Sequence, residues 1–576
     1  MGVMKKAVLI ITLIIMAGAG FYFFGQKRAL APVQNSPSVP GENIPVIIVP
    51  HFDTFSAKRS EILNYVGGKY KPETVVVVSV DHYNSGQSDI TTAEKTWLFS
   101  SGNVSSNASL TKKLSDSGIA GSDETAFLEE HGITNVLPDI RDNLSENILP
   151  IIIKDTTKRE DVDKLADWIK SNCSDCLVVA SVDFSHYQPN ALAKIHDSYS
   201  IQALASLDAD KTWAAETDSP QTLYLAEQVA KIAKSDNFHL YYNSNSGEII
   251  GNDDAQTTSV VLGYYSDKLT ETAIAPLTSF VIAGDAMFDR DVWSGFKTAG
   301  LKTIFDNFGT RVFRGVDCPV INMEGPVSSV PVAGTPRVSL NFNFQPEVPS
   351  VLKYLNVGAV SLANNHTNNA GTSGFASTKT KLTESGIKYF GQPSGFDSSA
   401  SILRIDGPIP ATIIGIMTLS SFDESAIETV IKSEKFAGRT VIIFPHWGTE
   451  YAPKHSLSQE RMAKGWIAAG ADLIIGSHPH VTEDFQLVDG KPVIYSLGNF
   501  VFDQFFSDAT QQGLVVAGTI TTDKIILSFL PTIEHKIKPQ FMTGSAKTDK
   551  LKTIFDINSE IGFKRISSDT IEISRQ

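Results

Sequence analysis

The sequence predicts an α/β protein in which two folded domains follow a single N-terminal transmembrane helix. In both halves of the chain, short β-branched runs of strand length alternate with helical patterns, which is typical of a largely parallel sheet. The chain has 576 residues, and about 530 remain after an apolar N-terminal segment and a polar stalk, which is enough for at least two domains. Several apolar runs end in a histidine or an acidic residue, so the same pattern also predicts where the chemistry lies.

Residues 7–24 form the apolar segment, and its eighteen uncharged residues follow Lys5 and Lys6. This length is at the short end for a membrane span and slightly long for the core of a cleaved signal peptide. We expect an uncleaved signal anchor over residues 1–28, with a cleaved signal peptide as the alternative. The two lysines before the segment predict an N-terminus that stays inside. Both interpretations place the rest of the chain outside the cytoplasm, and the first makes it a single-pass protein of the cell membrane.

Residues 29–44 are rich in proline, serine, asparagine and glycine. This composition builds no core and is typical of a flexible stalk. The formal net charge of the whole chain is −14 at pH 7, so nucleic acid is not an expected partner. The same charge makes the protein a poor electrostatic host for a polyanion, unless a bound metal supplies local positive charge.

The first folded half, residues 45–265, alternates strand-like runs with helix-like patterns. The strand-like runs cover 45–49, 75–80, 149–153 and 177–181, and the helix-like patterns cover 159–171, 189–206 and 220–234. Histidines follow strands here, among them His51, His82 and His186. Because ligands gather at the carboxyl ends of parallel strands, these histidines are candidate site residues.

Short motifs in this half carry a family resemblance. They are Pro50-His51, Asp81-His82, Glu130-His131, residues 181–187 and residues 259–264. Together they resemble the Memo family, which shares its fold with the class III extradiol ring-cleaving dioxygenases. The resemblance implies an α/β domain with a strand-end pocket, and in the dioxygenases two histidines and a glutamate hold non-haem iron there.

His51 and His82 would be the two histidines of such a pocket. No carboxylate is obvious for the third place, and Thr257 and Thr258 stand where some Memo proteins carry a cysteine. Two interpretations stay open: a pocket without redox chemistry, or a second metal site made by His51, His82 and His186. A redox role for that metal site is a further hypothesis.

The chain has three cysteines. Cys173 and Cys176 form a lone Cys-x-x-Cys pair, which offers too few ligands for a zinc site. A local disulfide, permitted by an oxidising exterior, and free thiols are the two alternatives. Cys318 begins an apolar run and is expected in the core.

In the second half, five apolar runs each end in a side chain that can bind a metal or transfer a proton. These side chains are Asp285, Glu324, Asn365 with His366, His446, and His478 with His480. Because ligands bind at the carboxyl ends of strands in open α/β sheets, we expect the groups to converge. Mixed oxygen and imidazole ligands suit Mn, Zn or Fe better than Ca, which prefers oxygen ligands alone.

Six motifs in this half occur in one order along the chain: residues 283–285, 322–324, 363–367, 446–451, 476–480 and 495–500. With them, residues 279–535 resemble the CapA family of poly-γ-glutamate capsule synthesis proteins. That family is similar to the calcineurin-like metallophosphoesterases, which implies an α/β sandwich. The resemblance implies that one or two divalent ions are held by Asp285, Glu324, Asn365, His446, His478 and His480. It also implies that His366 is the catalytic general acid.

The sequence departs from the phosphoesterase pattern at two places. Two residues after Asp285 stands Met287 rather than a histidine, so centres of one and of two ions both stay open. Asn369 stands where many relatives carry aspartate. Outside this domain, residues 266–278 are expected to form a linker and residues 536–576 a small C-terminal β appendage.

These features predict a metal-dependent hydrolase outside the membrane, linked to capsule or poly-γ-glutamate synthesis. Its substrate would be a phosphate ester or a bond in an anionic surface polymer. Two ions about 3.5–4 Å apart can clamp a phosphoryl oxygen and activate a water, and a nearby histidine can protonate the leaving oxygen. The alternative is a non-catalytic component that binds or assembles an anionic surface polymer through metal.

Overall fold

The computed structural model describes residues 41–270, 273–329, 340–555 and 562–575. The expected membrane helix lies outside these residues, as does most of the expected stalk. Within the described parts of the chain, no helix is long and apolar enough to cross a membrane. The described chain is mixed α/β, with one sheet system in each half, which confirms the coarse fold class.

An eleven-stranded sheet forms the first half. Its main path runs β10 (Asn237–Asn245), β11 (Thr257–Ser266), β1 (Val46–Val49), β8 (Cys176–Ser181), β2 (Thr74–Val80), β7 (Asn147–Ile153), β3 (Ile90–Thr92) and β6 (Gly121–Ser122). The neighbours β1, β8, β2 and β7 are parallel. Their carboxyl ends therefore reach the same edge, and loops that follow them can build one pocket.

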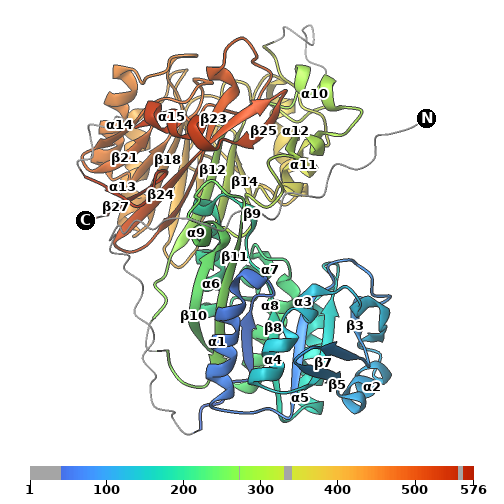
Figure 1. Cartoon of the computed structure of the whole chain (residues 1–576). Helices are drawn as coiled ribbons and strands as arrows, with labels where there is room; N and C mark the ends of the chain where they lie inside the picture. The colour runs from blue at the N-terminus through green and yellow to red at the C-terminus, as the bar shows by residue number, and fades with distance from the viewer. Residues whose placement is uncertain (1–40, 271–272, 330–339, 556–561, 576) are drawn as a thin grey trace, which may run out of the picture. The chain divides into compact units, whose positions relative to one another are not determined.

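Helices cover both faces of this sheet (Figure 1), and alternate residues of its strands belong to two different cores. The helices are α1 (Ser56–Gly67) and α4 (Leu137–Asn143) on one face, and α5 (Arg159–Asn172) and α8 (Pro220–Ala233) on the other. Val75 and Val77 of β2 belong to the first core, and Val76 and Val78 belong to the second. Since both faces are covered, β2 is apolar without interruption, as expected for a buried parallel strand.

Two further sheets pack face to face in the second half. The ten-stranded sheet runs β15 (Lys388–Phe390), β14 (Ala359–Ser361), β13 (Cys318–Met323), β12 (Thr278–Ala286), β23 (Gln512–Ile520), β24 (Lys524–His535), β27 (Thr570–Ser574) and β26 (Lys564–Arg565). The six-stranded sheet runs β16 (Ile402–Ile405), β17 (Ala411–Met417), β18 (Thr440–His446), β19 (Leu473–Ile475), β21 (Lys491–Ile494) and β20 (Phe485–Val488). One buried cluster joins them, with Phe280 and Val320 from the first sheet and Phe444 and Leu473 from the second.

Helices cover the outer faces of both sheets. They are α11 (Val348–Tyr354) and α12 (Gly371–Glu384) over the ten-stranded sheet, and α13 (Glu424–Phe436) and α14 (Leu457–Ala469) over the six-stranded sheet. The expected C-terminal appendage is continuous with the ten-stranded sheet, because β25 (Lys538–Phe541) and β27 both pair with β24.

The cysteines differ in their role. Cys173 and Cys176 form a disulfide, so the structure selects the first of the two alternatives. Cys318 is buried at the start of β13 and belongs to the core between the two sheets, as expected.

Parallel strands bring the predicted site residues of the second half to one edge. β12, β13 and β14 are parallel neighbours, and Asp285, Glu324 and Asn365 lie at or just beyond their carboxyl ends. β18 and β19 are parallel in the other sheet, and they deliver His446 and His478 in the same way. The donors therefore come from both sheets.

Candidate metal centres

Asp285 is completely buried at the end of β12. Its Oδ1 accepts a hydrogen bond from Asn322 Nδ2 at 2.8 Å, and its Oδ2 accepts one from the backbone N of His478 at 3.1 Å. The preceding residue must be glycine, because a Cβ on Gly284 would lie 2.0 Å from the carbonyl oxygen of Gly498. The Gly-Asp pair thus lets a neighbouring loop approach closely and fixes the carboxylate.

The first donor group joins Asp285, Glu324 and His446, whose potential ligand atoms lie within 4.8 Å of one another. His446 Nε2 is 3.4 Å from Glu324 Oε1 and 2.9 Å from Asn365 Oδ1. The three members of this group are buried, whereas the neighbouring Asn365 is exposed. The three members and Asn365 come from four different strand ends.

The imidazole of His446 suits a cation at Nε2. Ser477 Oγ donates to the carbonyl oxygen of Pro445 at 3.2 Å, so it is available to accept from His446 Nδ1, also at 3.2 Å. Asn322 Nδ2 also lies 3.3 Å from this nitrogen, but it donates to Asp285 Oδ1 at the shorter distance of 2.8 Å, so the contact to Ser477 favours the tautomer with the proton on Nδ1. In this tautomer the lone pair of Nε2 faces the oxygens of Glu324 and Asn365. A nitrogen lone pair and two oxygen atoms that face one another repel, and a metal ion bound between them would remove this repulsion.

The second donor group joins Glu450, His478 and His480, again with ligand atoms within 4.8 Å of one another. His480 Nδ1 lies 3.0 Å from Asn499 Oδ1, which orients the ring. Its Nε2 lies 4.0 Å from Glu324 Oε2. Glu324 therefore stands between the two groups, with Oε1 near His446 and Oε2 near His480.

Two buried polar atoms at this place have no hydrogen-bond partner among the described residues. They are Glu324 Oε2 and His478 Nδ1, and each belongs to a side chain that is at most 5% exposed. A buried polar atom without a partner is costly, so each such case in a native fold needs an explanation. A bound ion at the two donor groups would supply one.

The backbone here is held in an unusual conformation. His478, His480 and Tyr451 have positive φ angles of 101°, 59° and 65°. Non-glycine residues in this region cost on the order of 1–3 kcal/mol each, and such strain gathers at functional sites. We infer that these loops adopt the strained backbone because it places the side chains of both histidines at the site.

Burial keeps the imidazoles neutral and the carboxyl groups reluctant to ionise. It lowers the pKa of His478 to about 4 and that of His480 to about 3, and it holds the pKa of His446 well below its ordinary value. It also raises the pKa of Asp285 to about 7 and that of Glu324 well above its ordinary value. Neutral imidazoles are ready ligands, and a divalent cation would offset the burial of the two carboxylates.

His366 lies beside the first donor group. Its Nδ1 is 3.1 Å from Asn369 Oδ1, and its Nε2 is 3.2 Å from Asn365 Nδ2. The ring stacks on Phe342, with 4.2 Å between the centroids. Burial lowers its pKa, and the hydrogen bond to Asn369 opposes that change only in part.

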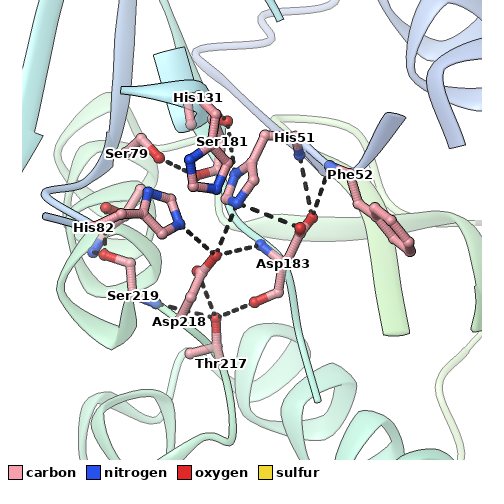
Figure 2. A network of polar contacts seen from close by, with 12 residues as sticks. His51, Phe52, Ser79, His82, His131, Ser181, Asp183, Thr217, Asp218 and Ser219 are labelled. Carbon is pink, nitrogen blue, oxygen red and sulfur yellow. Dashed lines mark hydrogen bonds and ion pairs between the residues drawn. The ribbon is translucent and has the colours of Figure 1, made fainter. Parts of the chain in front are cut away.

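The first half of the chain brings histidines and carboxylates together in a second, separate place (Figure 2). His51 Nε2 lies 3.1 Å from Asp218 Oδ2 and 3.3 Å from Asp183 Oδ2. His82 Nε2 lies 3.7 Å from the same Asp218 oxygen. A ring nitrogen of His131 lies within 4.8 Å of a ring nitrogen of each of the other two histidines. Asp218 is thus shared by His51 and His82, as Figure 2 shows.

His82 has a further carboxylate partner, Glu130, whose Oε1 lies 2.6 Å from its Nδ1. Burial alone would lower the pKa of His82, but its bonds to Asp218 and Glu130 outweigh burial and raise the pKa to about 9. The pKa of Asp218 is lowered despite its burial, because His51 and His82 favour its charged form.

Of the expected His51, His82 and His186, the first two share Asp218. His186 is absent from the groups of donors found in the described residues, and its backbone N donates to Glu216 Oε2 at 3.1 Å. The carboxylate that the sequence did not reveal is Asp218. It lies in the segment before α8, where Ser219 caps the helix by accepting a hydrogen bond from Thr222 N. The sequence there indicates the start of a helix and gives no sign of a site residue.

Comparisons with known proteins agree with this division of the chain. Residues 279–504 match the bacterial capsule synthesis protein PGA_cap family, and residues 19–260 match the Memo-like protein family. Each half of the chain therefore matches one family. Both resemblances seen in the sequence are confirmed.

Curated relatives repeat the same pattern. The PGA biosynthesis protein CapA of Bacillus subtilis (strain 168) is 29% identical over 41% of this chain and 66% of its own length. The capsule biosynthesis protein CapA of Bacillus anthracis is 27% identical over 50% of this chain and 72% of its own. A MEMO1 family protein of Nitrosopumilus maritimus (strain SCM1) is 26% identical over 43% of this chain and 97% of its own.

Among solved structures, an uncharacterised protein of Escherichia coli K12 covers 38% of this chain and 99% of its own, with 12% identity and a TM-score of 0.29. A similarity of that size supports no argument about the site.

Proposed function

We propose that this protein is a metal-dependent hydrolase of the metallophosphoesterase type that acts in the synthesis of a capsule or poly-γ-glutamate polymer. The observation that carries the proposal is the position of Glu324, whose two oxygens face two separate donor groups. A carboxylate in that position can bridge two ions. The match of residues 279–504 to a capsule synthesis family supports the link to a surface polymer.

The apolar segment of residues 7–24 supports an anchor in the cell membrane, with both folded halves outside the cytoplasm. The disulfide between Cys173 and Cys176 fits an oxidising compartment. In this arrangement the stalk would hold the folded halves at the surface where the polymer is made.

The residues that line the site would each have a separate part in the reaction. Mn, Zn or Fe held by the two donor groups would polarise a phosphoryl oxygen and lower the pKa of a bound water. His366, positioned by Asn369, would donate a proton to the leaving oxygen. Asn365 Oδ1 faces His446 Nε2, and Asn365 Nδ2 lies 3.2 Å from His366 Nε2. His366 would therefore have to take up a proton at Nε2 and turn away from this amide before it could act as the acid.

The test is elemental analysis of the detergent-solubilised full chain, paired with turnover of phosphomonoester and phosphodiester substrates under added Mn, Zn or Fe. Bound metal with turnover supports the hydrolase. Absence of metal after reconstitution contradicts the assignment of the site.

The second candidate function is a non-catalytic, metal-dependent component that binds an anionic surface polymer. It is favoured by the apolar Met287, which directly follows β12 and stands where the phosphoesterases carry a ligand. Metal-dependent binding of poly-γ-glutamate without cleavage, in a chain that holds metal, would favour this candidate over the first.

For the first half we propose a metal site made by His51, His82 and Asp218. Its support is the pair of contacts that both histidines make with one carboxylate. The test is reconstitution of the full chain with iron or copper, followed by metal analysis of an Asp218→Asn variant. Equal iron and copper content in wild type and variant would remove Asp218 from the site.

A further inference from the structure

Glu450 is the one exposed member of the second donor group. Its partners His478 and His480 are almost completely buried, and the potential ligand atoms of the three side chains lie within 4.8 Å of one another. His478 Nδ1 has no hydrogen-bond partner among the described residues. A buried nitrogen without a partner, with a carboxylate close by, is a place where a cation would be stabilised.

The backbone holds Glu450 against this pair of histidines. Trp447 N donates to the carbonyl oxygen of Ser477 at 3.1 Å, and Tyr451 N donates to that of Pro479 at 2.7 Å. The segment with Glu450 is therefore fastened on both sides to the segment with the histidines. An exposed glutamate on a free loop would sample many positions, whereas this one is confined to the neighbourhood of the donor group.

The start of the same segment is fixed in the core. Trp447 is fully buried, its Nε1 donates to the carbonyl oxygen of Tyr495 at 2.8 Å, and its ring stacks on Trp466 at 5.4 Å. Gly448 follows with φ of 90°, and a Cβ there would lie 2.7 Å from Gln459 Nε2. The chain turns at this glycine, which directs the following residues back over the site.

The ten-stranded sheet does not supply a full set of ligands to the second donor group. β12 supplies Asp285, but Met287 is buried, its backbone N donates to the carbonyl oxygen of Val501 at 2.9 Å, and its sulfur accepts from Asp289 N at 3.0 Å. A thioether so placed is a weak ligand for Mn, Zn or Fe. Glu324 Oε2 is one oxygen donor near His480, and Glu450 is a further carboxylate with an oxygen within 4.8 Å of a nitrogen of both histidines.

We propose that Glu450 is a ligand of a second ion, together with His478, His480 and Glu324 Oε2. The proposal rests on the proposed function, since it assumes that the first donor group also binds an ion. Two imidazole nitrogens and two carboxylate oxygens suit Mn, Zn or Fe. Because Glu450 is exposed, this second ion lies on the solvent side of the centre and is the one that exchanges more readily.

The experiment measures Mn²⁺ binding to the chelator-treated full chain by calorimetry and elemental analysis, in wild type, Glu450→Gln and Glu347→Gln. The last variant makes the same chemical change at an exposed glutamate before α11. We expect Glu450→Gln to bind about one ion per chain fewer than wild type and control, because the centre accommodates two ions in wild type and the proposed site of the first half is the same in all three proteins. Circular dichroism of the metal-free proteins verifies that all three fold alike.

The outcomes separate this proposal from the proposed function. If Glu450→Gln binds as many ions as wild type with unchanged affinity, Glu450 is not a ligand, while the proposed centre stands. If wild type takes up no Mn²⁺, both proposals fail. If wild type binds a single ion, no second ion is held at Glu450 and this proposal is overturned, whereas the proposed function, which one ion can serve, is not.

Discussion

Glu324 Oε1 lies 3.4 Å from His446 Nε2, in a region where both side chains are shielded from solvent. The other oxygen of Glu324 has no hydrogen-bond partner among the described residues and faces the second donor group. One carboxylate thus connects two clusters of ligands, and its replacement is the most direct test of the centre.

Glu324→Gln should abolish stabilisation by metal without weakening the metal-free fold. In the absence of an ion the variant removes a buried carboxyl group whose pKa is already raised well above its ordinary value, so its thermal midpoint in chelator should equal or exceed that of wild type. Added Mn²⁺ should raise the midpoint of wild type and leave that of the variant unchanged. Glu534→Gln, another buried carboxyl of the same half, should respond to Mn²⁺ as wild type does.

His366→Ala should remove turnover and leave the metal in place. The side chain lies beside Asn365 but is not a member of either donor group. Loss of a general acid reduces the rate by about 10²–10⁴-fold, whereas metal content by elemental analysis should not change. Undiminished turnover in this variant would mean that another group protonates the leaving oxygen.

Asn369→Asp should move the alkaline limb of the pH–rate profile to higher pH. A carboxylate at this place would accept from His366 Nδ1 and favour the imidazolium, so the pKa of His366 would rise from its present lowered value. A general acid acts only below its pKa, so activity should persist to a higher pH. The measurement is kcat/KM against pH, and identical profiles for variant and wild type would contradict the role of His366 as acid.

His82 should make the stability of the metal-free first half depend on pH. Its pKa in the folded chain is raised to about 9, so the stability that its contacts contribute is complete below about pH 6.5 and is lost as pH rises through about 9. Denaturant unfolding in chelator should therefore show wild type more stable than His82→Gln near pH 6, by roughly 2–3 kcal/mol, and the difference should shrink toward pH 9. His239→Gln, on β10 and outside this network, is the matched control.

The position of the centre in the second half followed from the sequence, because each donor stands directly after an apolar run. Asp285, Glu324 and His446 could be placed together since parallel strands in one fold bring their carboxyl ends to a common edge. The position of Glu450 at the site could not be predicted in this way. It follows a turn rather than a strand, and its place depends on backbone bonds to a distant loop.

In the first half, the rule that site residues follow strand ends identified only some of the residues that lie together. His51 and His82 follow strands and do meet, but His186 follows a strand end and does not join them. Asp218 lies before a helix and far from any strand in sequence, so neither hydrophobic periodicity nor motif spacing could reveal it.

The origin of the donors in two different sheets has a consequence for metal supply. Asp285 and Glu324 come from one sheet, and His446, His478 and His480 come from the other. The set of donors is therefore complete only after the sheets have packed, so capture of an ion by these donors would be one of the last events of folding. Since selection among divalent metals depends on which are available as well as on the ligands, the metal pool of the compartment where this packing is completed would decide which ion the protein acquires.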